Sequence, residues 1–89
     1  MQWEKQAADK LEELVQVVRE PFRGVIRSAA QAHAEKYATT RKNPHVTVKE
    51  AVLGFLRARS HKLTTEGSLL LKEFGMEENE FTNYHPELK

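Results

Sequence analysis

Side chains suited to a protein core recur every three or four positions along residues 22–37, and no other feature of this sequence constrains its fold so strongly. The stripe consists of Phe22, Val25, Ile26, Ala29, Ala30, His33 and Tyr37. This spacing brings the side chains onto one face of an α-helix. Pro21 suits the first turn of such a helix, because its missing N–H would have no partner there. The pattern predicts a helix from Pro21 to about Thr40.

A second segment with helical spacing precedes Pro21 and runs from about Trp3 to Arg19. Its apolar face comprises Trp3, Ala7, Leu11, Leu14, Val15 and Val18. Proline disfavours helical geometry at the residue before it. The first helix is therefore expected to end or kink at Glu20.

The third predicted helix begins at a capping box. The Thr47 hydroxyl caps the first turn, and the Glu50 carboxylate reaches back to the Thr47 backbone N–H. Apolar spacing continues this helix to about Arg59. Gly54 inside it marks either a weak point or a close approach of another helix.

A short fourth helix follows, capped by Thr64 or Thr65 and ending near Phe74. Gly75 suits the left-handed conformation that ends a helix, with Met76 packing back onto it. We expect the core to contain Leu11, Leu14, Val18, Phe22, Val25, Ile26, Ala29, Ala30, Tyr37, Val48, Val52, Phe55, Leu56, Leu70 and Phe74. These segments predict an all-α fold, a small single-domain bundle of three main helices plus a short fourth helix.

One helical domain is expected over residues 1–76, because a chain of 89 residues holds a single core. The remaining residues, 77–89, form an acidic and polar tail with Pro86 and no sustained apolar spacing. We expect this tail to be mobile, or to be ordered only where Phe81 and Tyr84 dock.

The sequence lacks the residue patterns that most kinds of catalysis need. It has no cysteine, which excludes disulfides, thiolate zinc sites, cysteine-ligated iron–sulfur clusters and a cysteine nucleophile. His33 lies on the apolar stripe and is expected to be partly buried, whereas His45 and His61 lie in basic loops. No His-Glu-x-x-His run, glycine-rich phosphate loop or recognisable Ser–His–Asp arrangement is present. We therefore expect no enzyme activity, catalytic residue, metal site or cofactor.

The sequence also lacks the usual signals for membranes and secretion. No apolar stretch approaches the ~20 residues of a membrane span. No apolar secretory segment follows the first residues. We expect a cytoplasmic protein that does not associate with a membrane.

Charge is distributed unevenly along the chain despite a net charge of only +1. Residues 19–62 carry ten basic and three acidic side chains, a charge of +7, and the two flanks together carry −6. Such segregation indicates an anionic partner for the basic segment, acidic flanks that fold over it, or both. The candidate surface for an anionic partner consists of Arg19, Arg23, Arg27, Arg41, Lys42 and Lys49. Two other interpretations stay open: solvation alone, and internal pairing of these cations with Glu12, Glu13 or the acidic tail.

A set of short motifs extends over a little more than half of the chain. In order, these are Trp3, Ala8, Leu11, Ile26-Arg27, Glu35-Lys36-Tyr37-Ala38, Val46-Thr47 and Val52. Their order resembles that of the PCP_red domain, which ends the B subunit of light-independent protochlorophyllide reductase, a nitrogenase-like enzyme, and also occurs alone as small bacterial proteins. The segment between Trp3 and Ile26 is longer than in that family, the proline that usually precedes its Val-Arg step is out of register, and residues beyond Leu63 have no counterpart. The resemblance implies a small helical module beside redox assemblies, without an active site.

Two hypotheses about function follow. The first, implied by the resemblance, is a non-catalytic interaction or accessory module with a protein partner, associated with a nitrogenase-like oxidoreductase. The alternative is a histone-like basic homodimer that binds DNA through phosphate contacts, since a helix, a loop, Val46-Thr47 and another helix also resemble half of a histone fold. Support for nucleic acid is weak, because the aromatic residues lie mostly on core stripes rather than between the cations.

Overall fold

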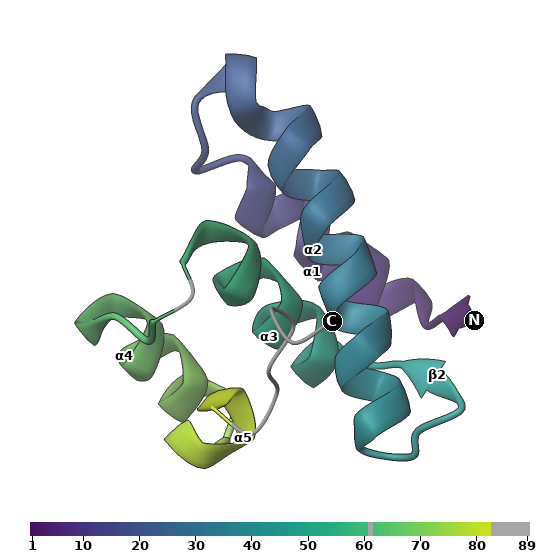
Figure 1. The fold of residues 1–89 in the computed structure, drawn as a ribbon. Coiled ribbons are helices and arrows are strands. Elements are labelled where there is room, and N and C mark those ends of the chain that lie inside the picture. Colours follow the sequence, from purple (N-terminus) through teal and green to yellow (C-terminus); the bar gives the residue numbers. More distant parts are fainter. Residues whose placement is uncertain (61, 83–89) are drawn as a thin grey trace.

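Five helices and two short strands form the part of the chain that the computed structural model describes, residues 1–60 and 62–82 (Figure 1). In chain order they are β1 (Gln2–Trp3), α1 (Lys5–Val15), α2 (Glu20–Thr40), β2 (His45–Val46), α3 (Val48–Arg59), α4 (Thr65–Glu73) and α5 (Glu78–Thr82). The two strands pair in parallel and are only two residues long each. The prediction of a small all-α fold is confirmed.

Helix α3 lies at the centre of the fold, with α1 and α2 on one side and α4 and α5 on the other (Figure 1). Every residue from Glu50 to Phe55 is buried. Small residues allow this packing, since Gly54 of α3 lies against Ala30 and Ala34 of α2. A methyl group at Gly54 would overlap the α2 backbone, so the interpretation of this glycine as a close-approach site is confirmed.

Helices α2 and α3 have nearly the bounds that the sequence predicts. Pro21 lies in the first turn of α2, which ends at Thr40. Ahead of α3, the Thr47 N–H donates to the Glu50 carboxylate at 2.9 Å and the predicted capping box forms. The residues that determine both helix starts lie within a few positions of each other, so the sequence predicts these starts without tertiary information.

The start and the end of α4 also agree with prediction. The Thr64 hydroxyl accepts a hydrogen bond from the Gly67 N–H at 3.0 Å and caps the helix. After the last turn, Gly75 adopts the left-handed conformation, with φ at 70°. The Met76 N–H then donates to the Leu71 carbonyl oxygen at 2.9 Å, and the Met76 side chain is buried.

The N-terminal end of α1 differs from the prediction. Trp3 does not lie on this helix; it lies in β1, where it pairs with Val46 of β2. The Glu4 N–H donates to the Val46 carbonyl oxygen at 3.0 Å, so strand pairing continues up to the first residue of α1. The Trp3 indole N–H donates to the Glu35 carboxylate of α2 at 3.0 Å and holds the strand in this position.

The C-terminal end of α1 is set by an arginine from the next helix. The Arg23 guanidinium of α2 donates to the carbonyl oxygens of Val18 and Gln16, at 2.8 and 3.0 Å. These carbonyls follow the last helical residue, Val15, and receive from a side chain the hydrogen bonds that another helical turn would supply. The prediction that this helix continues to Arg19 is therefore wrong.

The buried face of α2 is narrower than its apolar stripe. Its buried residues are Ala30, Ala34, Tyr37 and Ala38. Phe22 and Val25 remain 58% and 69% exposed, so their expected core positions are wrong. The N-terminal end of α2 projects beyond α3 (Figure 1), and Phe22 and Val25 face solvent there. His33 is half-buried, as expected.

The segment after Met76 adds a fifth helix, α5, that the sequence analysis assigned to the tail. Phe81 of α5 is 1% exposed and packs in the same core cluster as Tyr37, Leu53 and Leu71. The core therefore includes residues beyond 76. Tyr84 and the remainder of the expected tail, residues 83–89, lie outside the described residues.

Candidate functional site

Two of the six predicted partner-binding cations join α2 to α1. Arg23 caps the end of α1, as described above. Arg27 donates from Nε and Nη2 to the two carboxylate oxygens of Glu12, at 2.7 and 2.9 Å. This hydrogen-bonded pair lowers the pKa of Glu12 and raises the pKa of Arg27. Both arginines therefore have structural roles within the fold.

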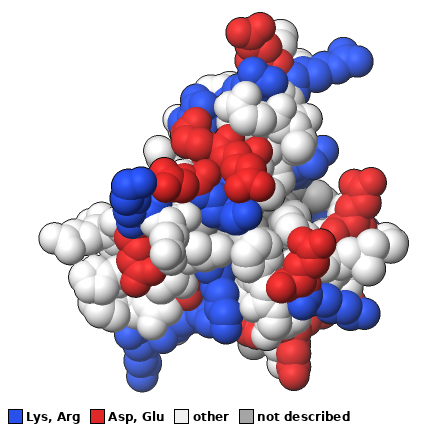
Figure 2. All heavy atoms as spheres, turned by 180° about the vertical axis from the view of Figure 1, so that it is seen from behind, with Lys and Arg blue, Asp and Glu red and all other residues white. Residues whose placement is uncertain are grey.

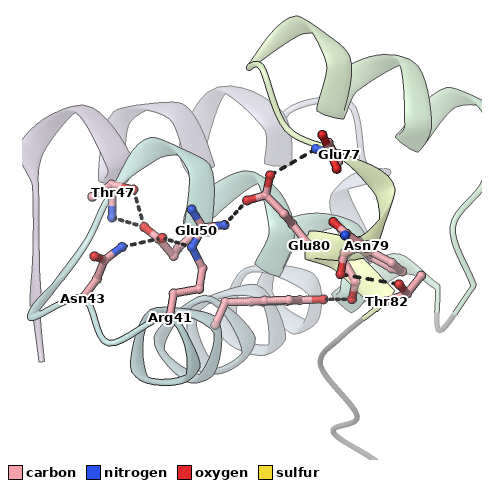
Figure 3. A network of polar contacts seen from close by, with 10 residues as sticks. Arg41, Asn43, Thr47, Glu50, Glu77, Asn79, Glu80 and Thr82 are labelled. Atoms are coloured by element: carbon pink, nitrogen blue, oxygen red, sulfur yellow. Dashed lines mark hydrogen bonds and ion pairs between the residues drawn. The ribbon is translucent and has the colours of Figure 1, made fainter.

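A third predicted cation, Arg41, joins a buried carboxylate of α3 to α5 (Figure 3). Its Nε lies 2.9 Å from Oε2 of Glu50, which is fully buried, and its Nη1 lies 2.5 Å from Oε1 of Glu80. Glu50 also accepts hydrogen bonds from the Asn43 side-chain amide at 2.7 Å and from the Thr47 hydroxyl. The buried charge of Glu50 is thus compensated by one cation and several donors, which such burial requires.

Glu80 is held in its charged form by the groups around it. Burial alone would raise the pKa of this carboxyl, but the Glu77 N–H, the Arg41 guanidinium and Lys49 together hold the pKa below its usual value. A carboxyl whose pKa is lower in the folded state stabilises the fold above its ordinary pKa and loses that contribution as the pH falls through the lowered value.

We expect Glu80→Gln to reduce the free energy of unfolding by about 1 kcal/mol at pH 7, because it removes the partly buried ion pair with Arg41. The difference between wild type and variant should shrink as the pH falls below about 4.5, the ordinary pKa of this carboxyl, and disappear once the pH has fallen through the lowered pKa of the folded state. Urea unfolding followed by circular dichroism from pH 7 to pH 3 measures both effects. Glu73→Gln, an exposed position on α4, is the control, and equal losses in the two variants would contradict the assignment.

Arg57 of α3 makes a second set of contacts to α5, which the sequence analysis missed. Its Nη2 donates to the Phe81 carbonyl oxygen at 2.8 Å, and the Tyr37 hydroxyl donates to the same oxygen at 2.9 Å. The guanidinium carbon lies 4.1 Å from the centre of the Phe81 ring. Arg57 follows Leu53 by one helical turn, and this position on the buried face of α3 was the available sequence signal.

The remaining three predicted cations, Arg19, Lys42 and Lys49, are exposed. Arg19 lies between α1 and α2, whereas Lys42 and Lys49 lie before and after β2. In the part of the chain that the structure describes, none of the three forms an ion pair. Figure 2 shows basic and acidic side chains interspersed over one whole face of the molecule. The six candidates lie toward opposite ends of the 21-residue helix α2, and Arg23, Arg27 and Arg41 are bound within the fold, so the six do not form one basic surface. A role of Arg19, Lys42 and Lys49 in partner binding stays a prediction.

An exposed apolar strip on α2 is a second candidate surface. Phe22 and Val25 share one face of the helix, and the same spacing continues through half-buried Ala29 and exposed Ala32. We call these four residues the α2 outer stripe. The sequence analysis identified three of them but assigned them to the core, because apolar spacing alone does not distinguish a core face from a binding face.

The described residues contain no group of three His, Asp or Glu side chains arranged to hold a metal ion. Within the same residues, no helix is long and apolar enough to cross a membrane. Comparison with known proteins found no matching family model, curated protein or solved structure.

Proposed function

We propose that this protein is a non-catalytic interaction module that binds a larger protein partner through the α2 outer stripe. One observation carries the proposal: Phe22 and Val25 are 58% and 69% exposed on the same face of α2. Burying apolar surface on binding is favourable by about 25 cal/mol per Å². Large side chains that enter a partner's pocket supply much of the binding energy of an interface. The alanines that continue the stripe let another helix approach closely.

The charges around the α2 outer stripe indicate what its partner presents. Arg19 precedes the stripe and Lys36 follows it on α2, and both are exposed. The acidic residues of α2 lie away from the stripe in the helical repeat, and one of them, Glu35, is bound to the Trp3 indole. These features favour a partner with an apolar groove or helix bordered by acidic side chains.

The resemblance to the PCP_red domain supports the same class of function. That domain accompanies a nitrogenase-like reductase, and we propose a subunit of such an oxidoreductase as the partner. In this proposal the protein acts in the cytoplasm beside the enzyme and has no catalytic role. A gene for a nitrogenase-like subunit next to the gene for this protein would support the proposed partner, and a series of unrelated neighbouring genes would weaken it.

We expect Phe22→Ser combined with Val25→Ser to weaken partner binding by at least about thirtyfold, the loss typical of a central apolar anchor. The free energy of unfolding should change by no more than about 0.5 kcal/mol, since both side chains are exposed. Affinity purification from the native host, followed by titration of the recovered nitrogenase-like subunit, measures binding. Leu69→Ser, at a 59% exposed position of α4, is the matched control. Equal binding by the two variants would refute the proposed surface.

The internal roles of Arg23, Arg27 and Arg41 favour a protein partner over DNA, because three of the six candidate cations already have partners within the fold. Retention of the protein on duplex DNA tests the alternative. DNA binding would be shown by retention that falls steeply with salt and is abolished by Lys42→Glu with Lys49→Glu. That outcome would support the histone-like alternative and overturn the present proposal.

A further inference from the structure

A cleft of about 310 Å³ lies between the C-terminal ends of α1 and α3 and the first turns of α4. Its apolar walls include Leu14, Val17, Phe55, Leu63, Leu70 and Phe81. None of the four residues of the α2 outer stripe lines it. Small-molecule sites in proteins are apolar hollows of about 300–1,000 Å³ with a few polar groups, so the cleft lies at the small end of this range.

The charged groups of the cleft are mainly basic, and the hydroxyl residues Ser60 and Thr64 also line it. Arg59 and Lys62 both line it and are exposed to solvent, whereas Glu66 is the one acidic residue among the described residues that line it. In the described part of the chain, neither cation forms an ion pair. The Arg59 guanidinium carbon lies 5.7 Å from the centre of the Phe55 ring, so this charge is adjacent to the apolar wall. A ligand that fits the cleft therefore combines an apolar body with a negative charge.

We propose that the cleft binds an amphipathic anion, an unbranched acyl chain whose carboxylate lies between Arg59 and Lys62. A methylene group occupies roughly the volume of a water molecule in the liquid, about 30 Å³. The cleft volume of about 310 Å³ thus accommodates a chain of about eight to ten carbons. The chain packs along the apolar walls, and the carboxylate receives charge-assisted hydrogen bonds from the two cations.

Binding of octanoate and decanoate to the wild-type protein tests the apolar part of the proposal. Each buried methylene group tightens binding by about fourfold, so decanoate should bind about 15-fold more tightly than octanoate. Dodecanoate should show no comparable further gain, because the cleft is then full. Titrations followed by NMR should shift the signals of Leu63 and Leu70, which line the cleft, and leave those of Phe22 and Val25 in place. The opposite pattern of shifts, or equal affinities along the series, would refute this site.

Charge variants test the anionic part of the proposal. Arg59→Glu with Lys62→Glu should weaken decanoate binding by about tenfold at low salt, and high salt should reduce this difference. Lys72→Glu makes the same change at an exposed α4 position outside the cleft and should leave affinity within about twofold of wild type. Decylammonium, with the same chain and the opposite charge, should bind at least about tenfold more weakly than decanoate.

Two results would overturn the proposed ligand. One is equal affinity of the wild-type protein for decanoate and decylammonium, which would mean that the cleft binds apolar chains without selecting the charge of the head group. The other is a shift of the Leu63 and Leu70 signals on dilution of the ligand-free protein, which would identify a second copy of the chain as the occupant. Neither measurement involves the α2 outer stripe, so either result would overturn the proposed ligand and leave the proposed partner surface unaffected.

Discussion

Gly54→Ala should reduce the free energy of unfolding by about 3 kcal/mol, at the upper end of the range for overpacked cores. An added methyl group at this position would lie 2.5 Å from the Ala30 carbonyl oxygen and 2.6 Å from the Ala34 nitrogen. Both atoms belong to the α2 backbone and cannot turn away, so α2 and α3 would have to separate along their shared core. This loss exceeds the gain in stability of about 0.5–1 kcal/mol that replacing glycine by alanine usually gives within a helix.

The matched control for this variant is Gly24→Ala in α2. A methyl group at Gly24 would meet no atom within 4 Å, and the position is exposed. Only the helix-propensity effect remains there, so we expect a gain of about 0.5–1 kcal/mol. Chemical unfolding of both variants by circular dichroism measures the two changes, and a stabilising effect of Gly54→Ala would contradict the close approach of α2 and α3.

Phe81→Ala should reduce the free energy of unfolding by about 3–5 kcal/mol, the usual cost of removing a buried aromatic ring. The ring is 1% exposed and packs against core residues of α2, α3 and α4. The substitution also removes the cation–π contact with Arg57, whose guanidinium carbon lies 4.1 Å from the ring centre. A domain of this size has a total stability of only about 5 kcal/mol, so the variant should retain no more than about 2 kcal/mol and melt at a much lower temperature than the wild type.

Thr82→Ala, at the adjacent exposed position of α5, is the control for Phe81→Ala and should change stability by no more than about 0.5 kcal/mol. Thermal melting followed by circular dichroism distinguishes the two variants. Similar melting temperatures for both would mean that α5 does not contribute to the core, and the contacts of Arg57 and Tyr37 with the Phe81 carbonyl would then lose their structural role.

The starts and ends of α2, α3 and α4 are features that local sequence predicts. Thr47 and Glu50 form their capping box, Thr64 caps α4, and Gly75 ends it with a positive φ. In each case the groups that satisfy the helix end lie within a few residues of it along the chain. The class of fold follows from these helices.

Local sequence predicts α1 less well, because distant residues determine both of its ends. Pairing of Trp3 with Val46 replaces the first helical turn, and Arg23 of α2 supplies the hydrogen bonds that end the helix after Val15. Neither interaction leaves a signal in the spacing of apolar residues within the helix itself.

The candidate functional residues also divide into features that local sequence identifies and features that only tertiary packing decides. Sequence alone identified the cations and the apolar stripe of α2, but not which of them would stay exposed. Arg27 pairs with Glu12 and Arg41 with Glu80 because tertiary packing brings their helices together, whereas Phe22 is left in solvent.

What the sequence determined by itself is therefore the set of helices with local caps and the segregation of charge along the chain. The tertiary structure alone decided which charges are neutralised, which apolar residues face solvent, and that Arg57 binds the Phe81 carbonyl across 24 residues. The physical reason is range: a helix cap is satisfied by neighbours in sequence, whereas burial and ion pairing depend on which faces of distant helices meet.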